Sequence, residues 1–208
     1  NTAEQVIVPT QKVKELLLNY SVHRDISVVP TGVNLKKFNP DLYPKEDVLK
    51  LRQRYGIKAE DKVLLYLGRI SKEKNIAEII EAMPEYMKNR KNVKFLIVGG
   101  GPEMDDLKHM VAKEKMQDSI IFTGPQPWDN IGIFYQLGDV FVSASQSETQ
   151  GLTYIEAMAA GLPVVAKKDK CLQDILVPGW NGFDFTDRES LMKGLDAIFF
   201  NENHVPYG

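Results

Sequence analysis

Short apolar segments alternate with amphipathic segments along most of the chain. The apolar segments have the length and β-branched content of buried strands, and the intervening segments place apolar residues three and four positions apart, as helices do. Predicted strands cover residues 5–9, 26–30, 63–67, 93–98, 120–122, 140–144 and 163–166. Predicted helices cover residues 10–20, 46–55, 75–89, 102–115, 128–137, 151–160 and 187–200. This alternation predicts an α/β fold, a Rossmann-like parallel sheet with helices on both faces.

The first strand, helix and strand form a separate unit in this pattern. A single strand–helix–strand unit cannot bury its own apolar faces. We therefore interpret residues 1–38 as the tail of a preceding domain together with the crossing between domains, and residues 39–208 as the next domain. Because Asn1 is not an initiator methionine and a strand begins within a few residues, we expect the chain to be a piece of a larger protein.

Composition excludes several classes of protein. The chain has 208 residues, of which 43% are hydrophobic and 26% are charged, so disordered and fibrous classes are excluded. The net charge of −2 gives no support to a nucleic-acid partner. The single cysteine, Cys171, excludes an internal disulfide framework and fits a reducing compartment. No apolar run approaches the ~20 residues needed to cross a bilayer.

The most informative stretch is the loop and helix at residues 147–161. Glu148 follows the predicted strand at 140–144, at the carboxyl end of the sheet, where open α/β sheets bind ligands. Glu156 lies just over one turn into the next helix. Backbone amides between the two carboxylates cannot be satisfied within that helix. The pattern predicts an anion-binding helix end with one carboxylate beside it and one below it.

Arg69 and Lys74 follow the strand at 63–67 and therefore share an edge of the sheet with Glu148. Charge-assisted hydrogen bonds contribute roughly 1.5–3 kcal/mol each, which is more than an exposed helix end supplies, so this pair suits a nucleotide diphosphate. The alternative is a solvated charged loop that caps the next helix. The shared edge with Glu148 favours binding.

Three further features leave alternatives open. Gly99, Gly100 and Gly101 either let the backbone approach a ligand or make a tight strand-to-helix turn, with Pro102 at the first helical position. Glu156 is either a surface residue or, because its neighbours leave little polar face, the partner of a ribose diol. Trp128 heads a predicted helix, where we expect it only to cap the domain.

Sequence spacing gives no sign of a metal site. The three histidines are scattered, and there is no Cys/His cluster and no Asp-x-Asp pair that could hold a divalent ion on a diphosphate. Cys171 has no histidine near it in sequence, so we interpret it as a packed thiol rather than a nucleophile.

Taken together, these residues resemble the donor-binding domain of a retaining glycosyltransferase of family 4 (group 1), which has the GT-B architecture. The resemblance covers about residues 5–200. The segments that carry it are Gly32-Val33-Asn34, Leu67-Gly68-Arg69 with Lys74, Val98-Gly99-Gly100-Gly101-Pro102, Phe122-Thr123-Gly124, Glu148 with Glu156-Ala157-Met158-Ala159, Gly161-Leu162-Pro163-Val164-Val165 and a late turn at Asn181-Gly182-Phe183. The paired glutamates with the Gly-x-Pro-Val-Val tail are highly specific in combination.

The resemblance implies a nucleotide-sugar donor and a role for each matched position. Arg69 and Lys74 would hold the diphosphate, and Glu156 would bind the ribose hydroxyls. Glu148, the catalytic residue, would contact the transferred sugar as a nucleophile or as an electrostatic partner. The other donor-binding positions are Gly99, Gly100, Gly101, Gly124, Pro125 and Gln126, which flank the base and ribose, and Gly151, Leu152 and Thr153, whose amides help to hold the diphosphate. The resemblance implies no metal and no other cofactor.

The resemblance also bears on partners. Residues 1–30 would be the last strand–helix–strand piece of the acceptor-binding half, and the rest of that half is missing, so we expect donor binding with little or no transfer. Phrases such as Val13-Lys14-Glu15-Leu16-Leu17 and Asp169-Lys170-Cys171-Leu172 are similar to bacterial diacylglycerol glucosyltransferases. That similarity implies UDP-glucose as donor and a membrane lipid as acceptor. It also implies a cytoplasmic location, with the full-length protein peripheral on the inner membrane face. A UDP-sugar epimerase of GT-B architecture and a non-catalytic nucleotide-binding module stay open.

Overall fold

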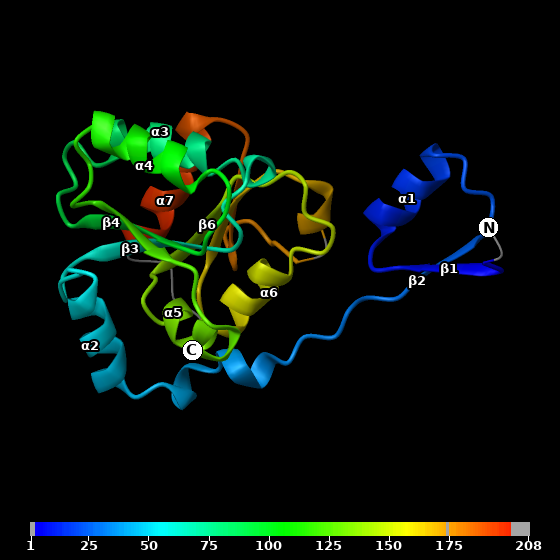
Figure 1. Ribbon diagram of the computed structural model, residues 1–208, viewed down its shortest axis with the longest axis horizontal. Helices are drawn as coiled ribbons and strands as arrows, with labels where there is room; N and C mark the ends of the chain where they lie inside the picture. The colour runs from blue at the N-terminus through cyan, green and yellow to red at the C-terminus, as the bar shows by residue number, and fades with distance from the viewer. Residues whose placement is uncertain (1–2, 174, 201–208) are drawn as a thin grey trace.

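The computed structural model describes residues 3–173 and 175–200, which contain two parallel β-sheets (Figure 1). The smaller sheet pairs β1 (Gln5–Val8) with β2 (Asp25–Val28), and α1 (Gln11–Asn19) connects them. We call residues 5–28 the small unit. The other strands form one larger sheet, and we call residues 33–200 the large unit.

The large unit is built on six parallel strands in the order β5-β4-β3-β6-β7-β8. The strands are β3 (Lys62–Leu67), β4 (Val93–Val98), β5 (Ile120–Gly124), β6 (Val140–Ser143), β7 (Val164–Lys167) and β8 (Gly182–Phe185). The chain runs outward from β3 to β5 and then returns to place β6 on the other side of β3. Such a reversal is a topological switch point, where open α/β sheets bind ligands. The loops after β3 and β6 flank this point.

Helices cover both faces of the large sheet, which confirms the predicted Rossmann-like α/β fold (Figure 1). One face is covered by α3 (Ile76–Tyr86), α4 (Met104–Lys113) and α7 (Arg188–Phe199), and the other by α5 (Ile131–Tyr135) and α6 (Leu152–Ala159), with α2 (Lys45–Arg54) at the margin. Because both faces are covered, β3 and β4 are buried along nearly their whole length. Among the described residues, no helix combines the length and apolar character that a bilayer crossing needs.

Some predicted helices are shorter than their patterns indicate. Instead of a helix over 128–137, a 3₁₀ turn at Trp128–Asn130 leads into the five-residue α5. After α5, Asp139 pairs with β3 just before β6 begins: its amide donates to the Val63 carbonyl at 2.9 Å, and its carboxylate accepts from the Val63 amide at 2.7 Å. The predicted helix at 102–115 likewise begins later, at Met104.

The last strand is absent from the sequence prediction. The resemblance implies a late turn at residues 181–183; a turn does end at Asn181, and Gly182 then begins β8, which pairs in parallel with β7. A Cβ at Gly182 would lie 1.9 Å from the Val164 carbonyl oxygen, so the two backbones approach only because this residue is glycine. As an edge strand with two of its four residues buried, β8 lacks the continuous apolar run that identifies the inner strands.

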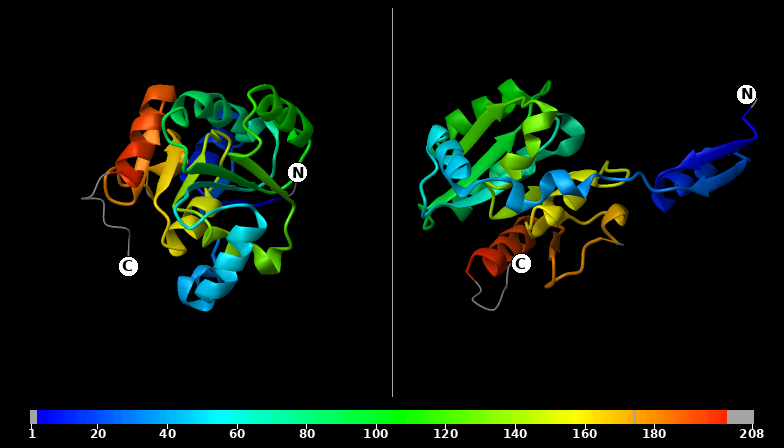
Figure 2. Two further views of the ribbon diagram at one scale, coloured as in Figure 1. Left: turned by 90° about the vertical axis from the view of Figure 1, so that its left-hand side faces the viewer. Right: turned by 90° about the horizontal axis from the view of Figure 1, so that it is seen from below.

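An extended segment joins the small unit to the large one (Figure 2). The small unit leaves large apolar side chains exposed, namely Ile7, Leu16, Leu18 and Tyr20. At the other end of the segment, Phe38 is 1% exposed and packs edge-on against Tyr135, with 5.5 Å between ring centroids. The core of the large unit therefore includes Phe38, while the domain boundary at 38/39 stays a prediction.

Candidate functional site

Two adjoining cavities open at the carboxyl ends of the strands beside the switch point. The first, of about 310 Å³, lies between the loop after β3, the loop after β6 and the first turn of α6. We call it the Glu148 cavity. The second, of about 510 Å³, extends over the loops after β4 and β5, and we call it the Glu156 cavity. The two share a wall made of Leu67, Gly68, Arg69, Leu152 and Thr153.

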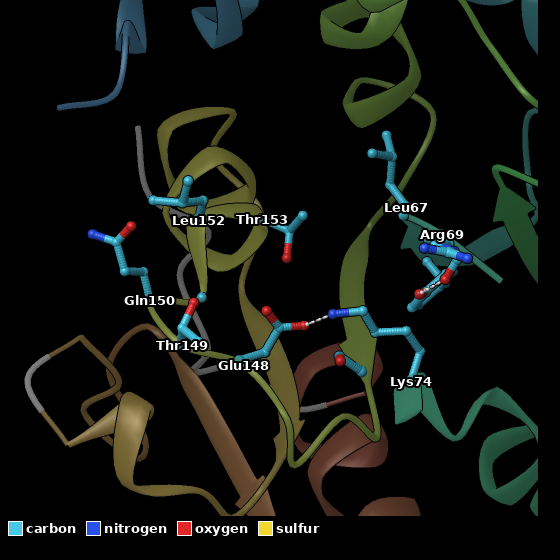
Figure 3. A pocket seen from close by; sticks show the side chains of 12 residues that line it. Leu67, Arg69, Lys74, Glu148, Thr149, Gln150, Leu152 and Thr153 are labelled. Carbon is cyan, nitrogen blue, oxygen red and sulfur yellow. Dashed lines mark hydrogen bonds and ion pairs between the residues drawn. The ribbon is translucent and has the colours of Figure 1, made fainter. Parts of the chain in front are cut away.

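Lys74 and Glu148 meet across the Glu148 cavity (Figure 3). The Lys74 Nζ donates to Glu148 Oε1 at 2.6 Å, and the two side chains are 22% and 18% exposed. Lys74 ends the 3₁₀ turn Lys72–Lys74, and Asn75 after it takes the left-handed conformation with φ of 49°, which turns the chain into α3. The cation expected near Glu148 is therefore in direct contact with it.

Arg69 lies in the wall that both cavities share, on the same side as Lys74 (Figure 3). Its backbone is fixed directly after β3, because the Tyr66 hydroxyl donates to the Arg69 carbonyl at 2.8 Å. Further along the loop, the buried Ser71 donates its hydroxyl to Glu73 at 2.6 Å, and this bond lowers the pKa of Glu73. The loop thus presents two cations from an internally bonded turn.

The N-terminus of α6 contributes to the same wall. Gly151, the N-cap, is left-handed with φ of 64° and has no side chain that could cap the helix. The first amides of a helix have no acceptor within it, so those of Leu152 and Thr153 are available beside the cavities. Figure 3 shows the Thr153 side chain pointing into the space next to Glu148. Two cations and a positive helix end therefore surround one space, which suits a bound anion.

Glu156 lies in the adjoining cavity and is only 6% exposed. The Tyr135 hydroxyl donates to its Oε2 at 2.7 Å. Burial raises the pKa of Glu156, and the bond from Tyr135 and the charge of Lys37 oppose that rise. A carboxylate has more acceptor positions than this one donor occupies, so it can accept further hydroxyl groups. The two carboxylates thus line neighbouring cavities that share a wall at the start of α6.

The glycine-rich loops have two different functions in the structure. Gly99 and Gly100 line the Glu156 cavity together with Pro125 and Gln126, whereas Gly101 and Gly124 line neither cavity. A Cβ at Gly99 would lie 1.9 Å from the Gly68 carbonyl oxygen, and one at Gly101 would lie 2.0 Å from the Ile70 carbonyl oxygen. Glycine at 99 and 101 is therefore required where the loops after β3 and β4 touch.

Sequence reasoning missed three residues around Glu156. Trp128 does more than cap the domain: it lines the Glu156 cavity and is 61% exposed. Lys37 lies over its ring, 4.2 Å from the centroid, and donates to its carbonyl oxygen. Tyr135 reaches Glu156 from α5. Only Trp128 carried a signal, an aromatic residue next to the predicted base-binding loop; Lys37 and Tyr135 meet the site through tertiary packing alone.

The geometry of the described residues also bears on metal and thiol chemistry. Within residues 3–173 and 175–200, no group of three His, Cys, Asp or Glu side chains is arranged to hold a metal ion, and the expectation of a metal-free reaction stays a prediction. Cys171 is half-buried, and burial together with Asp169 raises its pKa to about 12. A thiol that stays protonated at neutral pH is a poor nucleophile, in agreement with a packed cysteine.

Comparison with known proteins identifies relatives along the whole large unit. A family model described as glycosyl transferases group 1 matches residues 47–205. The chain is 36% identical to the alpha-monoglucosyldiacylglycerol synthase of Acholeplasma laidlawii over 192 residues, which cover 92% of this chain and 48% of that protein. It is 40% identical over 171 residues to the synthase of the same name from Streptococcus pneumoniae (strain ATCC BAA-255 / R6), and the match covers 82% of this chain and 39% of that protein. The chain thus spans half or less of these relatives.

Solved structures agree on the fold. The HepE protein of Anabaena in complex with UDP and glucose has a TM-score of 0.83 at 23% identity, covering 96% of this chain and 54% of that one. A sucrose-phosphate synthase from Thermosynechococcus elongatus has a TM-score of 0.81 at 27% identity, covering 96% and 50%. The family match extends over most of the chain and the architecture is the same. This chain therefore belongs to the group 1 glycosyltransferases, with the GT-B type of fold.

Proposed function

We propose that this chain is the donor-binding half of a retaining glycosyltransferase that transfers glucose from UDP-glucose to diacylglycerol in a membrane. The observation that carries the proposal is the Lys74–Glu148 ion pair at the switch point, beside the N-terminus of α6 and next to the buried Glu156. The choice of sugar and lipid is supported by the names of the two synthases, which are 36% and 40% identical to this chain.

The two cavities divide the donor between them. The diphosphate lies at their shared wall, where Arg69 and the amides of Leu152 and Thr153 are within reach of both spaces. The nucleoside extends into the Glu156 cavity, where its ribose diol donates to the carboxylate and its base lies against the loops that carry Gly100 and Pro125. The sugar then lies in the Glu148 cavity. In this arrangement the bond to be broken lies beside the Lys74–Glu148 ion pair.

Lys74 is placed to act on both the diphosphate and Glu148. An ammonium has three donors, and one of them is used at 2.6 Å by Glu148, so two are left for phosphate oxygens. As the bond to the sugar breaks, negative charge grows on the leaving diphosphate, and a fixed cation stabilises that charge. Glu148 faces the sugar and stabilises the positive charge that develops there, as a nucleophile or as an electrostatic partner.

The positive charge around the diphosphate comes from the protein in this proposal. Arg69, Lys74 and the helix end supply what a divalent ion supplies in other sugar-nucleotide sites. Donor binding is therefore expected to persist in the presence of a chelator. Calorimetry of UDP with and without EDTA measures this, and a loss of binding that added Mg²⁺ restores would show that the cations are insufficient.

Binding and transfer are tested separately. Calorimetry on this chain should show that UDP and UDP-glucose bind, and no heat at millimolar concentrations of either would exclude a donor site. Transfer is tested with the longest natural protein that contains this sequence, given UDP-glucose and diacylglycerol vesicles, with the product anomer identified by NMR. An α-linked product supports retention, and a β-linked product excludes it. Epimerised sugar without acceptor would instead favour an epimerase, and binding without any turnover a non-catalytic module.

A further inference from the structure

The small unit contacts the loop that carries Glu148. Three carbonyl groups of that loop, at residues 146, 148 and 149, accept hydrogen bonds from α1 and its N-cap. The Thr10 hydroxyl donates to the Thr149 carbonyl at 2.8 Å. The Lys12 Nζ donates to the Gln146 carbonyl at 3.2 Å and to the Glu148 carbonyl at 2.8 Å. These partners lie more than a hundred positions apart in the chain, so only the packing of the two units brings them together.

Lys12 is the centre of this contact. Besides the two carbonyls, its ammonium bonds both oxygens of Asp169 at 2.8 Å, so its three donors meet three acceptor groups. The Lys12 and Asp169 side chains are 27% and 8% exposed, which limits competition from water. Although burial of Asp169 raises its pKa, bonds from the Cys171 amide and from Lys12 outweigh this and hold the pKa below its usual value.

Glu148 is consequently held at both ends by lysines from different units. Its carboxylate accepts from Lys74 of the large unit at 2.6 Å, and its carbonyl accepts from Lys12 of the small unit at 2.8 Å. Apart from the bond from Thr10, which is at Thr149, the other contacts of the loop are longer: the Ser145 and Ser147 hydroxyls lie 3.5 and 3.4 Å from the Glu73 carbonyl. The direction in which the Glu148 side chain leaves the backbone therefore depends on Lys12.

We propose that Lys12 is a positioning residue for Glu148, which it acts on through the main chain of residues 146–148. This inference rests on the proposed function, because it assigns Lys12 to the step in which Glu148 faces the donor sugar. Lys12 lines neither the Glu148 cavity nor the Glu156 cavity. Its loss therefore affects the sugar-bearing ligand and spares the nucleotide.

A second ion pair supplies a matched control. Lys170 Nζ bonds Glu15 Oε2 at 2.9 Å and so also links α1 to the segment after β7. Both side chains of this pair are largely exposed, and its hydrogen bonds do not involve the Glu148 loop. Lys170→Met removes a link between the units, as Lys12→Met does, but leaves the three loop carbonyls bonded.

The experiment compares the affinities of UDP and UDP-glucose by calorimetry for the wild type, Lys12→Met and Lys170→Met. We expect Lys12→Met to weaken the binding of UDP-glucose by about 10-fold and the binding of UDP by less than about 2-fold. A small displacement of Glu148 strongly affects its contact with the sugar but leaves the contacts to the nucleotide in place. Lys170→Met should leave both unchanged. Since Lys12→Met leaves the buried Asp169 without its cation, a Lys12→Met/Asp169→Asn variant is measured as well, and the same selective loss is expected.

Hydrogen exchange of the loop amides at 147–151, without ligand, reports the positioning directly. We expect faster exchange there in Lys12→Met and wild-type exchange in Lys170→Met. Equal losses for UDP and UDP-glucose, no loss for either, or unchanged exchange in a folded Lys12→Met protein would overturn the inference. If the wild type binds neither ligand, the proposed function fails instead, and the exchange data still decide whether Lys12 orders the loop.

Discussion

Lys74 and Glu148 neutralise each other in a cavity that also receives Arg69 and the start of α6. An anion that enters this space meets more positive than negative charge, because only one of the two cations is paired with Glu148. In the proposed function the diphosphate binds in this space, and the ion pair reduces its repulsion by the carboxylate. Substitutions of the two cations should therefore weaken the binding of ligands that carry the diphosphate.

Arg69→Ala and Lys74→Ala should each weaken the binding of UDP by about 10- to 100-fold, the equivalent of one charge-assisted contact. The affinity for uridine should stay within about 2-fold of the wild-type value. Lys72→Ala is the matched control, because Lys72 lies in the same 3₁₀ turn but is exposed and lines neither cavity. Calorimetry with both ligands measures the effect. Equal losses for UDP and uridine would remove these residues from the phosphate site.

Replacement of Glu156 should have different effects on the stability of the protein and on its binding of UDP. Burial raises the pKa of Glu156, so its ionised form destabilises the folded state. Glu156→Gln should therefore leave the thermal midpoint at pH 7 unchanged or higher. Binding of UDP should nevertheless fall by about 5- to 30-fold, because an amide is a weaker acceptor for two ribose hydroxyls. A 2′,3′-dideoxyribose analogue should bind both proteins equally. A uniform loss for both ligands would contradict the ribose role.

The raised pKa of Glu156 also predicts a pH dependence. As pH falls through that pKa, the carboxyl group becomes protonated and UDP-glucose should bind more weakly, starting at a higher pH than for an ordinary glutamate. The stability that Glu156 contributes has the opposite trend, because it is present at low pH and is lost as pH rises through the raised pKa. UDP-glucose is the suitable ligand, since its diphosphate has no ionisation in this range. A Glu156→Gln protein that shows the same pH step would contradict this assignment.

Among the elements, the loops after β3 and β4 are as constrained as the strands that precede them. Gly99 has φ of 143°, and a Cβ there would collide with the Gly68 carbonyl. Gly100 is different: a Cβ would lie 3.3 Å from the Pro125 ring, an approach that a small shift relieves.

Gly99→Ala should therefore lower the free energy of unfolding by at least about 2 kcal/mol, and Gly100→Ala by no more than about 1 kcal/mol. Urea denaturation of the two variants and the wild type measures the difference. If Gly99→Ala proved as stable as Gly100→Ala, the close approach of the two loops would not be what selects glycine at position 99.

Elements with a strong local pattern could be predicted from the sequence, and those defined by neighbours could not. β3 and β4 are continuous apolar runs. The loops that carry Arg69 and Glu148 could be predicted to lie near each other, because the carboxyl ends of parallel strands meet at one edge of the sheet. β8 is held by backbone pairing to β7, and no periodicity identifies it. The site shows the same division: the edge of the sheet was predictable, but the bonds from Tyr135 to Glu156 and from Lys12 to Glu148 depend on tertiary packing.

At the scale of the whole molecule, the small unit buries little and the large unit begins before residue 39. Phe38 belongs to the core next to Tyr135, the hydrogen-bond partner of Glu156. A protein that starts at residue 29 should therefore stay cooperatively folded and bind UDP within about 3-fold of the full chain, since two-state folding follows a shared core.

A protein that starts at residue 40 should lose about 3–5 kcal/mol of stability, as expected for removal of a buried phenyl ring. Phe38→Ala in the full chain gives the matched comparison by urea denaturation. Similar stability of the two truncated proteins would instead support a boundary at 38/39.

The hydrogen bonds from Lys12 and Lys74 to Glu148 connect the geometry of the site to movement of the small unit relative to the large unit. A rotation of the small unit relative to the large one must either stretch the bond between Lys12 and the carbonyl or twist the peptide plane at residue 148. Such a rotation acts on the residue whose carboxylate we propose to face the donor sugar. The orientation of residue 148 therefore depends on the angle between the two units, and the position of its carboxylate changes as that angle changes.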